Sequence, residues 1–376
     1  MIYLDNAAST RLDDEVLAAM LPYLKENYGN AQSQHAAGRA CANAVSAARD
    51  KIAALAGCKA EEVYFVSGGT EAGNTALKGV CALHKKGHIV LSSIEHASLM
   101  ESALDMQKLG FEVTFVQPEK DGAVLAENIA KAMRDDTIFC AVMSANNETG
   151  VIQPVEEIGK ICRERGVFFY TDCVQTAAYL PLPVDFADGM GFSSHKFYGP
   201  KGAGALILRK RSDVFRLISG GMQEMGFRGG TVNTPGIVGT ATAYERACLG
   251  REKVNAYVKS LRDKFLNRVL NEIEGTQLNG ALDKMLPSIA NISFEGCDGE
   301  NILFLLDLKG ICVSTGAACA AGAVSPSDTL TAMGCALSEA KSAVRFSFGK
   351  HNTEEEVDVV LDALKFAVEK IRNNQK

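Results

Sequence analysis

Short apolar runs alternate with helical patterns between residues 60 and 210 of this chain. The runs show no strict alternation of apolar and polar residues, which is typical of strands buried on both faces of a sheet. Because helical patterns separate most of the runs, the strands are expected to pair mainly in parallel. The sequence therefore predicts an α/β fold whose central strands lie at 63–66, 88–91, 111–116, 137–143, 167–170, 189–192 and 203–208.

Longer helical patterns and two later apolar runs predict a second, smaller unit. A charged helical pattern over 244–272 is long enough to bridge two domains, and two further apolar runs follow it. We therefore expect a large domain over 14–250 and a smaller α+β domain built from 1–13 and 251–376. The expected helices are 14–27, 39–56, 70–84, 97–109, 125–133, 154–165, 244–272, 300–309 and 353–372, and the later strands are 288–294 and 311–314.

Composition and charge exclude several classes of protein. The net charge is −6 and no dense basic stripe is present, so a nucleic-acid partner is not expected. No apolar run approaches 18 residues, and the N-terminal residues lack the pattern of a signal peptide, so no membrane association is expected. The 11 cysteines form no C-x-x-C pairs and the 6 histidines show no metal-binding spacing. This pattern predicts no metal site and favours a reducing, cytoplasmic location.

A lysine and an acid follow two of the predicted strands. Lys196 comes after the run 189–192, together with Ser193 and His195, and Asp172 comes after the run 167–170. Ligands of open α/β sheets bind outside the carboxyl ends of the strands. A pyridoxal phosphate enzyme needs such a pair, because the lysine forms a Schiff base and the acid pairs with the pyridinium nitrogen.

Other predicted strands also end in polar residues. The segment 67–70, Ser-Gly-Gly-Thr before a helix, is typical of a phosphate cradle. Glu95-His96 and the segment 146–150 follow two more strands. Each of these segments alone is more often a turn or a helix cap, but several polar ends on one sheet edge favour a ligand site. No P-loop, nucleophile elbow or complete dinucleotide fingerprint competes with this interpretation.

The ordered motifs identify a family resemblance that runs nearly end to end. The chain resembles the group I cysteine desulfurases of the class V aminotransferase family, which are pyridoxal phosphate enzymes of fold-type I. The resemblance implies a large domain with a mainly parallel seven-stranded sheet, plus a smaller α+β domain. The motifs that carry it are YLDNAA at 3–8, YGN at 28–30, SGGTE at 67–71, EH at 95–96, NNE at 146–148, TDCVQ at 171–175, SSHK at 193–196, RGGT at 228–231 and RFS at 345–347.

The resemblance also implies the role of each site residue. Lys196 is expected to bind the cofactor covalently and to move protons, His96 to stack on the ring and act as an acid or base, and Asp172 to keep the ring nitrogen protonated. The substrate carboxylate is expected to meet Arg345, with Asn30 and Asn147 beside it. The remaining implied cofactor contacts are Gly69, Thr70, Asn147, Gln175, Ser193, His195 and, from the partner subunit, Thr231.

A segment of small residues over 314–322 contains the implied nucleophile, Cys319. Group I members carry their nucleophilic cysteine on a long mobile loop, and Gly316 and Gly322 bracket the cysteine here as possible hinges. The resemblance implies a homodimeric transferase that converts L-cysteine to L-alanine and leaves a persulfide on Cys319. A sulfur-acceptor protein would then take the sulfur for iron–sulfur cluster assembly or tRNA thiolation.

Two other functions remain open at this point. One is a different class V enzyme, such as an aminotransferase or a selenocysteine lyase. An aminotransferase needs no nucleophilic cysteine, so activity that survives loss of Cys319 would favour it. The other is a non-catalytic scaffold in a sulfur-assembly complex. The presence of Lys196, His96 and Asp172 together argues against a scaffold, since a scaffold does not need them.

Overall fold

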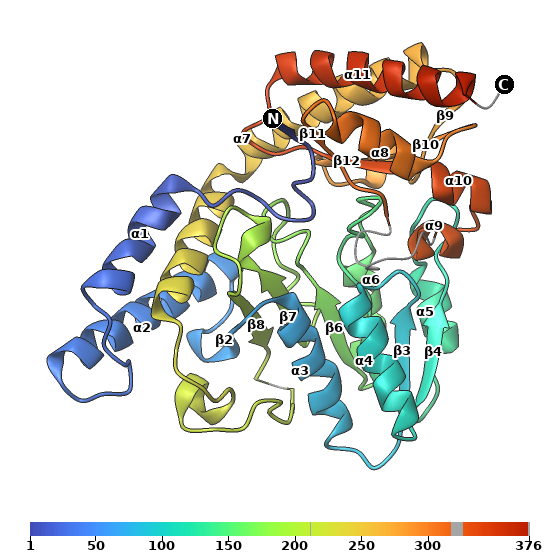
Figure 1. Cartoon of the computed structure of the whole chain (residues 1–376). Helices are drawn as coiled ribbons and strands as arrows, with labels where there is room; N and C mark the ends of the chain where they lie inside the picture. Colours follow the sequence, from blue (N-terminus) through green and yellow to red (C-terminus); the bar gives the residue numbers. More distant parts are fainter. Residues whose placement is uncertain (211, 317–325, 375–376) are drawn as a thin grey trace.

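A seven-stranded sheet forms the centre of the larger part of the molecule (Figure 1). In the computed structural model, which describes residues 1–210, 212–316 and 326–374, the strand order is β2-β8-β7-β6-β5-β3-β4. Strands β3 to β7 pair in parallel, and β8 is antiparallel to both β2 and β7. All seven predicted strands and the mainly parallel sheet are therefore confirmed. The strands are β2 Val63–Val66, β3 His88–Ser92, β4 Glu112–Val116, β5 Thr137–Ala141, β6 Phe168–Asp172, β7 Gly189–Ser193 and β8 Gly204–Leu208.

Helices cover both faces of this sheet (Figure 1). The predicted helices form with ends within three residues of those predicted, except that α7 begins ten residues before its predicted start. The extra residues have low helix propensity, but Pro235 occupies the first turn, Asn233 caps it, and burial of Ile237 and Ala241 stabilises it. No helix within the described ranges is long and apolar enough to cross a membrane. These helices are α1 Asp14–Lys25, α2 Ala36–Ala56, α3 Gly69–Cys81, α4 Ala97–Lys108, α5 Ala126–Ala132, α6 Val155–Glu164 and α7 Thr234–Glu272.

The C-terminal part contains a three-stranded antiparallel sheet in the order β12-β10-β9. The two predicted strands of this part correspond to β10 and β11. A short parallel pair, β1 with β11, fixes the N-terminal residues against it. Strands β1 and β9 were not predicted because they are only two and three residues long. The elements are β1 Ile2–Tyr3, β9 Thr276–Leu278, β10 Ile289–Phe294, α8 Gly299–Asp307, β11 Ile311–Cys312, α9 Asp328–Ala332, α10 Leu337–Ser342, β12 Ala343–Ser347 and α11 Glu354–Asn373.

Buried apolar residues gather in two main regions. One region runs from Val16 to Tyr244, and the other joins Leu4 to residues between Val258 and Ile371. This division supports our proposed boundary near residue 250, with 1–13 belonging to the smaller domain. Helix α7 contributes to both regions, so a continuous helix connects the two proposed domains.

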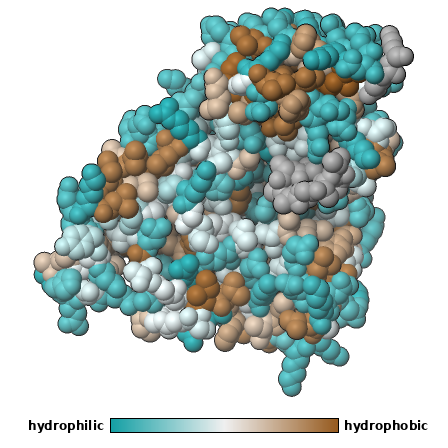
Figure 2. All heavy atoms as spheres, in the orientation of Figure 1, coloured by the Kyte–Doolittle hydropathy of each residue, from teal (hydrophilic) through white to brown (hydrophobic). Residues whose placement is uncertain are grey.

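The outer surface is mostly polar, with local apolar patches (Figure 2). One patch lies over α1, where Leu17, Leu21 and Leu24 are exposed. Their spacing places them on one face of the helix. A helix face of this kind is suited to contact with another protein surface.

A largely buried ion pair fixes the segment 223–226, which precedes α7, to α2 and β2. Glu224 accepts two hydrogen bonds of 2.8 Å from the Arg49 guanidinium and a third of 2.8 Å from the Phe65 amide. We expect Glu224→Ala to lower the free energy of unfolding by about 3–5 kcal/mol, because it leaves the Arg49 charge buried without its partner. Urea denaturation measures this loss.

The matched control is Glu245→Ala. Glu245 pairs with Lys51, also on α2, but both side chains are more than a third exposed. Its removal should cost about 1 kcal/mol or less. Equal losses for the two variants would show that the Glu224 pair does not stabilise the fold in this way.

Candidate active site

A cavity of about 330 Å³ lies at the carboxyl ends of the central strands. It is within the size range of small-molecule sites in proteins. The structure brings most of the predicted site residues together in its wall, although they come from distant parts of the chain. Those lining it are Gly69, Thr70, His96, Asn147, Asp172, Gln175, Ser193, His195, Lys196 and Arg345.

Lys196 ends the short 3₁₀ turn that follows β7. Its Nζ donates hydrogen bonds to the carbonyl oxygens of Ala7, at 2.6 Å, and Ala8, at 3.0 Å. The Gln175 amide also donates to the Ala7 carbonyl, at 3.0 Å. The N-terminal segment therefore forms one wall of the site. Sequence reasoning gave Ala7 and Ala8 no role, because a backbone carbonyl carries no side-chain signal.

Asp172 ends β6, and its carboxylate is buried beside His96 and Lys196. Burial raises the pKa of Asp172 above its ordinary value and outweighs the hydrogen bond of 2.8 Å from the Val174 amide and the nearby His96 and Lys196, which lower it. His96 caps α4, since its Nδ1 accepts from the Ser98 amide at 3.2 Å. This bond leaves Nε2 as the ring nitrogen that can face the cavity as a donor.

The start of α3 forms a cradle for an anion. The Gly69 amide donates to Ser193 Oγ at 2.7 Å, at the N-terminus of a 13-residue helix. A Cβ atom on Gly69 would lie 2.5 Å from the side chain of Val174, so only glycine fits here. His195 lies in the same wall, and burial together with the charges of Lys196 and Lys201 lowers its pKa to about 4. A neutral imidazole and a helix N-terminus can both donate to a phosphate.

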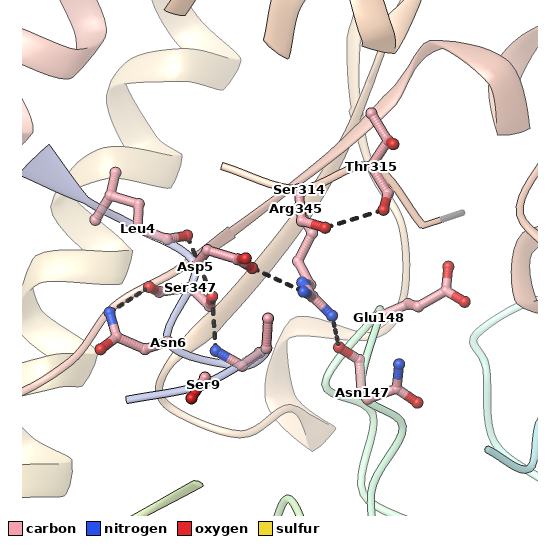
Figure 3. Close-up of polar contacts among 12 residues, drawn as sticks. Leu4, Asp5, Asn6, Ser9, Asn147, Glu148, Ser314, Thr315, Arg345 and Ser347 are labelled. Carbon is pink, nitrogen blue, oxygen red and sulfur yellow. Dashed lines mark hydrogen bonds and ion pairs between the residues drawn. The ribbon is translucent and has the colours of Figure 1, made fainter. Parts of the chain in front are cut away.

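Arg345 reaches the cavity from β12 of the C-terminal sheet (Figure 3). Its guanidinium donates to the Asn147 carbonyl at 2.7 Å and to the Asp5 carboxylate at 2.8 Å. Its Nε is buried and has no hydrogen-bond partner among the described residues. Figure 3 shows the three contributing segments meeting at this side chain. The ion pair with Asp5 was not predicted, although Asp5 belongs to the YLDNAA motif at 3–8.

Three predicted site residues do not line this cavity. Asn30 is exposed in the turn before α2, where its Oδ1 accepts from the Gln32 amide. Thr231 is exposed between the segment at 223–226 and α7. Cys319 lies outside the described residues. The roles expected of these three residues therefore stay predictions.

Glu95 is a buried acid next to the site that sequence reasoning left without a role. Its Oε1 accepts from Ser92 Oγ and from the Met143 amide, both at 2.6 Å, and its Oε2 is buried without a partner among the described residues. Burial, with the nearby charge of Asp172, raises the pKa of Glu95 to about 8. The one feature of the sequence that could have indicated a role for Glu95 is its position directly before His96.

The donor set fits pyridoxal phosphate. Lys196 supplies an amine, Asp172 a buried acid, and the Gly69–Ser193 cradle a place for a phosphate. All three line one cavity, whose remaining wall carries the cation of Arg345. Such a site can bind an aldehyde cofactor and a second, carboxylate-bearing molecule together. Within the described residues, no cluster of His, Cys, Asp or Glu could hold a metal ion.

Known proteins share both the sequence and the fold. The model of the aminotransferase class-V family matches residues 2–360. "Cysteine desulfurase IscS" of Dictyoglomus turgidum is 44% identical over 99% of this chain and 95% of its own length. A solved structure named "NIFS-like protein" superposes with a TM-score of 0.92 at 35% identity, covering 98% of this chain and 99% of the other. Another, "SspA in complex with cysteine", has a TM-score of 0.83 at 33% identity, covering 94% and 100%.

The chain therefore belongs to the class-V aminotransferase family, whose members depend on pyridoxal phosphate. Its relatives place it among the cysteine desulfurases of that family. The predicted fold-type I architecture, family and cofactor are thereby confirmed.

The raised pKa of Glu95 predicts a pH dependence of stability. The ordinary pKa of a glutamate is 4.5, so between pH 4.5 and about 8 the folded protein holds a proton that the unfolded chain has released. The free energy of unfolding should therefore fall as pH rises through this range. Glu95→Gln should remove that part of the slope, as measured by urea denaturation at several pH values.

Glu156→Gln is the control, because Glu156 is exposed on α6. This variant should keep the wild-type slope. If the Glu95→Gln and wild-type curves run parallel from pH 4.5 to 8, Glu95 is not protonated in the folded protein.

Proposed function

We propose that this protein is a cysteine desulfurase that uses the strand-end cavity to convert L-cysteine to L-alanine and places the released sulfur on Cys319. The observation that carries the proposal is the single cavity shared by Lys196, Asp172 and Arg345. An amine, a buried acid and a guanidinium are the groups needed to bind the cofactor and an amino-acid carboxylate side by side. The desulfurase relatives at up to 44% identity favour this reaction over an aminotransferase or a scaffold.

Some residues of the cavity would bind the cofactor and the substrate, and others would transfer protons. Pyridoxal phosphate, when bound, supplies a ring that withdraws electrons from the substrate carbons. Asp172 would hold a proton at the ring nitrogen, and Gly69, Thr70, Ser193 and His195 would bind the phosphate. Lys196 would take the α-proton of cysteine, while Arg345 orients the substrate carboxylate. The hydrogen bonds from Lys196 to Ala7 and Ala8 hold the amine in the cavity wall, where it can reach this proton.

Sulfur transfer from cysteine to Cys319 balances without another reactant. The thiolate of Cys319 would attack the sulfur of L-cysteine, forming an S–S bond as the C–S bond breaks. The electron pair of the broken bond stays with carbon, which takes up a proton to give alanine. The products are one L-alanine and one persulfide on Cys319.

We infer that the active form is a homodimer. Thr231 is exposed and lies outside the cavity of its own subunit, as expected if it completes the phosphate site of a partner. The apolar face of α1 provides surface that a partner subunit could cover (Figure 2).

The persulfide would pass to an acceptor protein, for iron–sulfur cluster assembly or tRNA thiolation. We propose a reducing, cytoplasmic location, where such a persulfide and the free thiols of the chain persist. All ten cysteines among the described residues are free thiols, and burial raises the pKa of several of them, including Cys140 and Cys173. Protonated, buried thiols are poor nucleophiles, which favours Cys319 as the reactive one.

Loss of Lys196 should abolish activity in a way that a second variant can complement. Lys196→Ala should make no alanine from L-cysteine, and Thr231→Ala should bind pyridoxal phosphate weakly. In a mixed dimer, the Thr231→Ala subunit keeps its own lysine and receives Thr231 from its partner. Mixing and refolding the two variants should therefore restore alanine production. No recovery in a verified mixed dimer would contradict the shared site.

Cys319→Ala should separate substrate binding from sulfur transfer. L-Cysteine should still change the visible spectrum of the cofactor, because none of the described cavity residues is altered. Alanine and persulfide should not accumulate, since no thiolate attacks the substrate sulfur. An alanine assay of both proteins, with mass spectrometry of the Cys319 peptide in the wild type and of the matching peptide in the variant, measures both products.

Cys297→Ala is the matched control, because this cysteine is partly exposed but distant in sequence from every cavity residue. It should retain full activity. Alanine production at the wild-type rate by Cys319→Ala would instead support a class V enzyme of another type.

A further inference from the structure

Glu148 is a second buried acid near the cavity, and none of the roles described above uses it. Its carboxylate accepts hydrogen bonds from Ser327 Oγ at 2.5 Å and from Thr329 Oγ1 at 3.1 Å. Burial raises its pKa, while these two hydroxyl donors and the charge of Arg345 lower it. A buried carboxylate destabilises a fold unless such groups compensate it. The chain therefore keeps three compensating groups around this one side chain.

The Glu148 carboxylate contacts residues on both sides of Cys319 in the sequence: it bonds Ser327 after it and lies against Gly316 before it. Ser327 caps α9, and its Oγ both accepts from the Leu330 amide and donates to Glu148. On the other side, Gly316 lies so close that a Cβ atom there would overlap Glu148 Oε2 and would lie 2.8 Å from Ser327 Cβ. Gly316 and Ser327 thus meet at the same carboxylate.

The turn that carries Glu148 also holds the proposed substrate arginine. Asn147 lines the cavity, and its carbonyl accepts from Arg345 at 2.7 Å. Figure 3 shows Asn147 and Glu148 following one another on the loop that faces Arg345. The Asn146 side chain fixes this turn, because its Oδ1 accepts from the amides of Glu148, at 2.8 Å, and Thr149, at 2.9 Å. One rigid turn therefore contacts both the substrate side and the residues that flank Cys319.

We propose that Glu148 is a positioning residue for sulfur transfer: by bonding Ser327 and packing against Gly316 near Arg345, it sets where the described residues on either side of Cys319 lie relative to the bound substrate. This inference rests on the proposed function of Cys319. Glu148 touches neither the cofactor cradle nor Lys196, so its effect falls on the transfer step and not on cofactor binding.

The test uses the cofactor-loaded enzyme and two separate readouts. The first is the change in the visible spectrum on adding L-cysteine, which reports substrate engagement. The second is the single-turnover rate of alanine and Cys319 persulfide formation. Glu148→Ala should leave the first readout unchanged and slow the second roughly tenfold or more, because hydrogen bonds to a buried charge are lost. Glu148→Gln should lie between the two, since its amide oxygen can still accept from one hydroxyl.

Ser327→Ala and Thr329→Val test the same contact from the other side and keep the carboxylate in place. Each should slow transfer, and adding Ser327→Ala to Glu148→Ala should slow it no further, because the bond between these two side chains is then already lost. These variants carry the test if Glu148→Ala does not fold. Thr331→Val is the matched control: within the described residues its hydroxyl bonds the Ser327 carbonyl and not Glu148, and sulfur transfer should stay at the wild-type rate.

Transfer at the wild-type rate in the Glu148 and Ser327 variants would overturn the inference, as would an equal loss of both readouts. Failure of the underlying function is a different result. In that case Cys319→Ala itself would still make alanine, whatever the Glu148 variants do.

Discussion

The ion pair between Arg345 and Asp5 holds the site together. Arg345 comes from β12, Asp5 follows β1, and the Asn147 carbonyl, which accepts from the same guanidinium, comes from the turn after β5. Without this cation, the other two segments would present a carboxylate and a carbonyl to one another with no donor between them. The same N-terminal segment goes on to supply the Ala7 and Ala8 carbonyls that hold Lys196. The position of the Lys196 amine thus depends on a contact that Arg345 makes with the same N-terminal segment.

The central sheet was predictable because its strands are buried on both faces. Runs such as 88–91 and 189–192 have no polar face to confuse their assignment, and each is bounded by a helix or by a Gly- or Ser-rich turn. The residues at their carboxyl ends could also be predicted to converge, since parallel strands end at one edge. Asp172 and Lys196 follow this rule and line the same cavity.

Other features depend on contacts between residues that are distant in sequence, which no local pattern reveals. The start of α7 has the composition of a loop, and its helical form comes from burial against α1 and α2. Strand β1 is too short to have a periodicity, and it exists because β11 pairs with it. The hydrogen bonds of Glu95 and Glu148 could likewise not be predicted. The sequence does not distinguish a buried glutamate from an exposed one, because the difference lies in the residues that surround it in the fold.

The closure of the N-terminal segment onto β12 has a consequence for folding during synthesis. Asn6 donates a hydrogen bond to the Ser347 carbonyl, 341 positions further along the chain. The segment around Asn6 therefore waits for 341 further residues to be synthesised before it finds this partner. The central sheet can form earlier, but the wall that holds Lys196 is completed only after β12 has emerged. A nascent chain that ends before β12 would thus hold the central sheet without the wall that contacts Lys196.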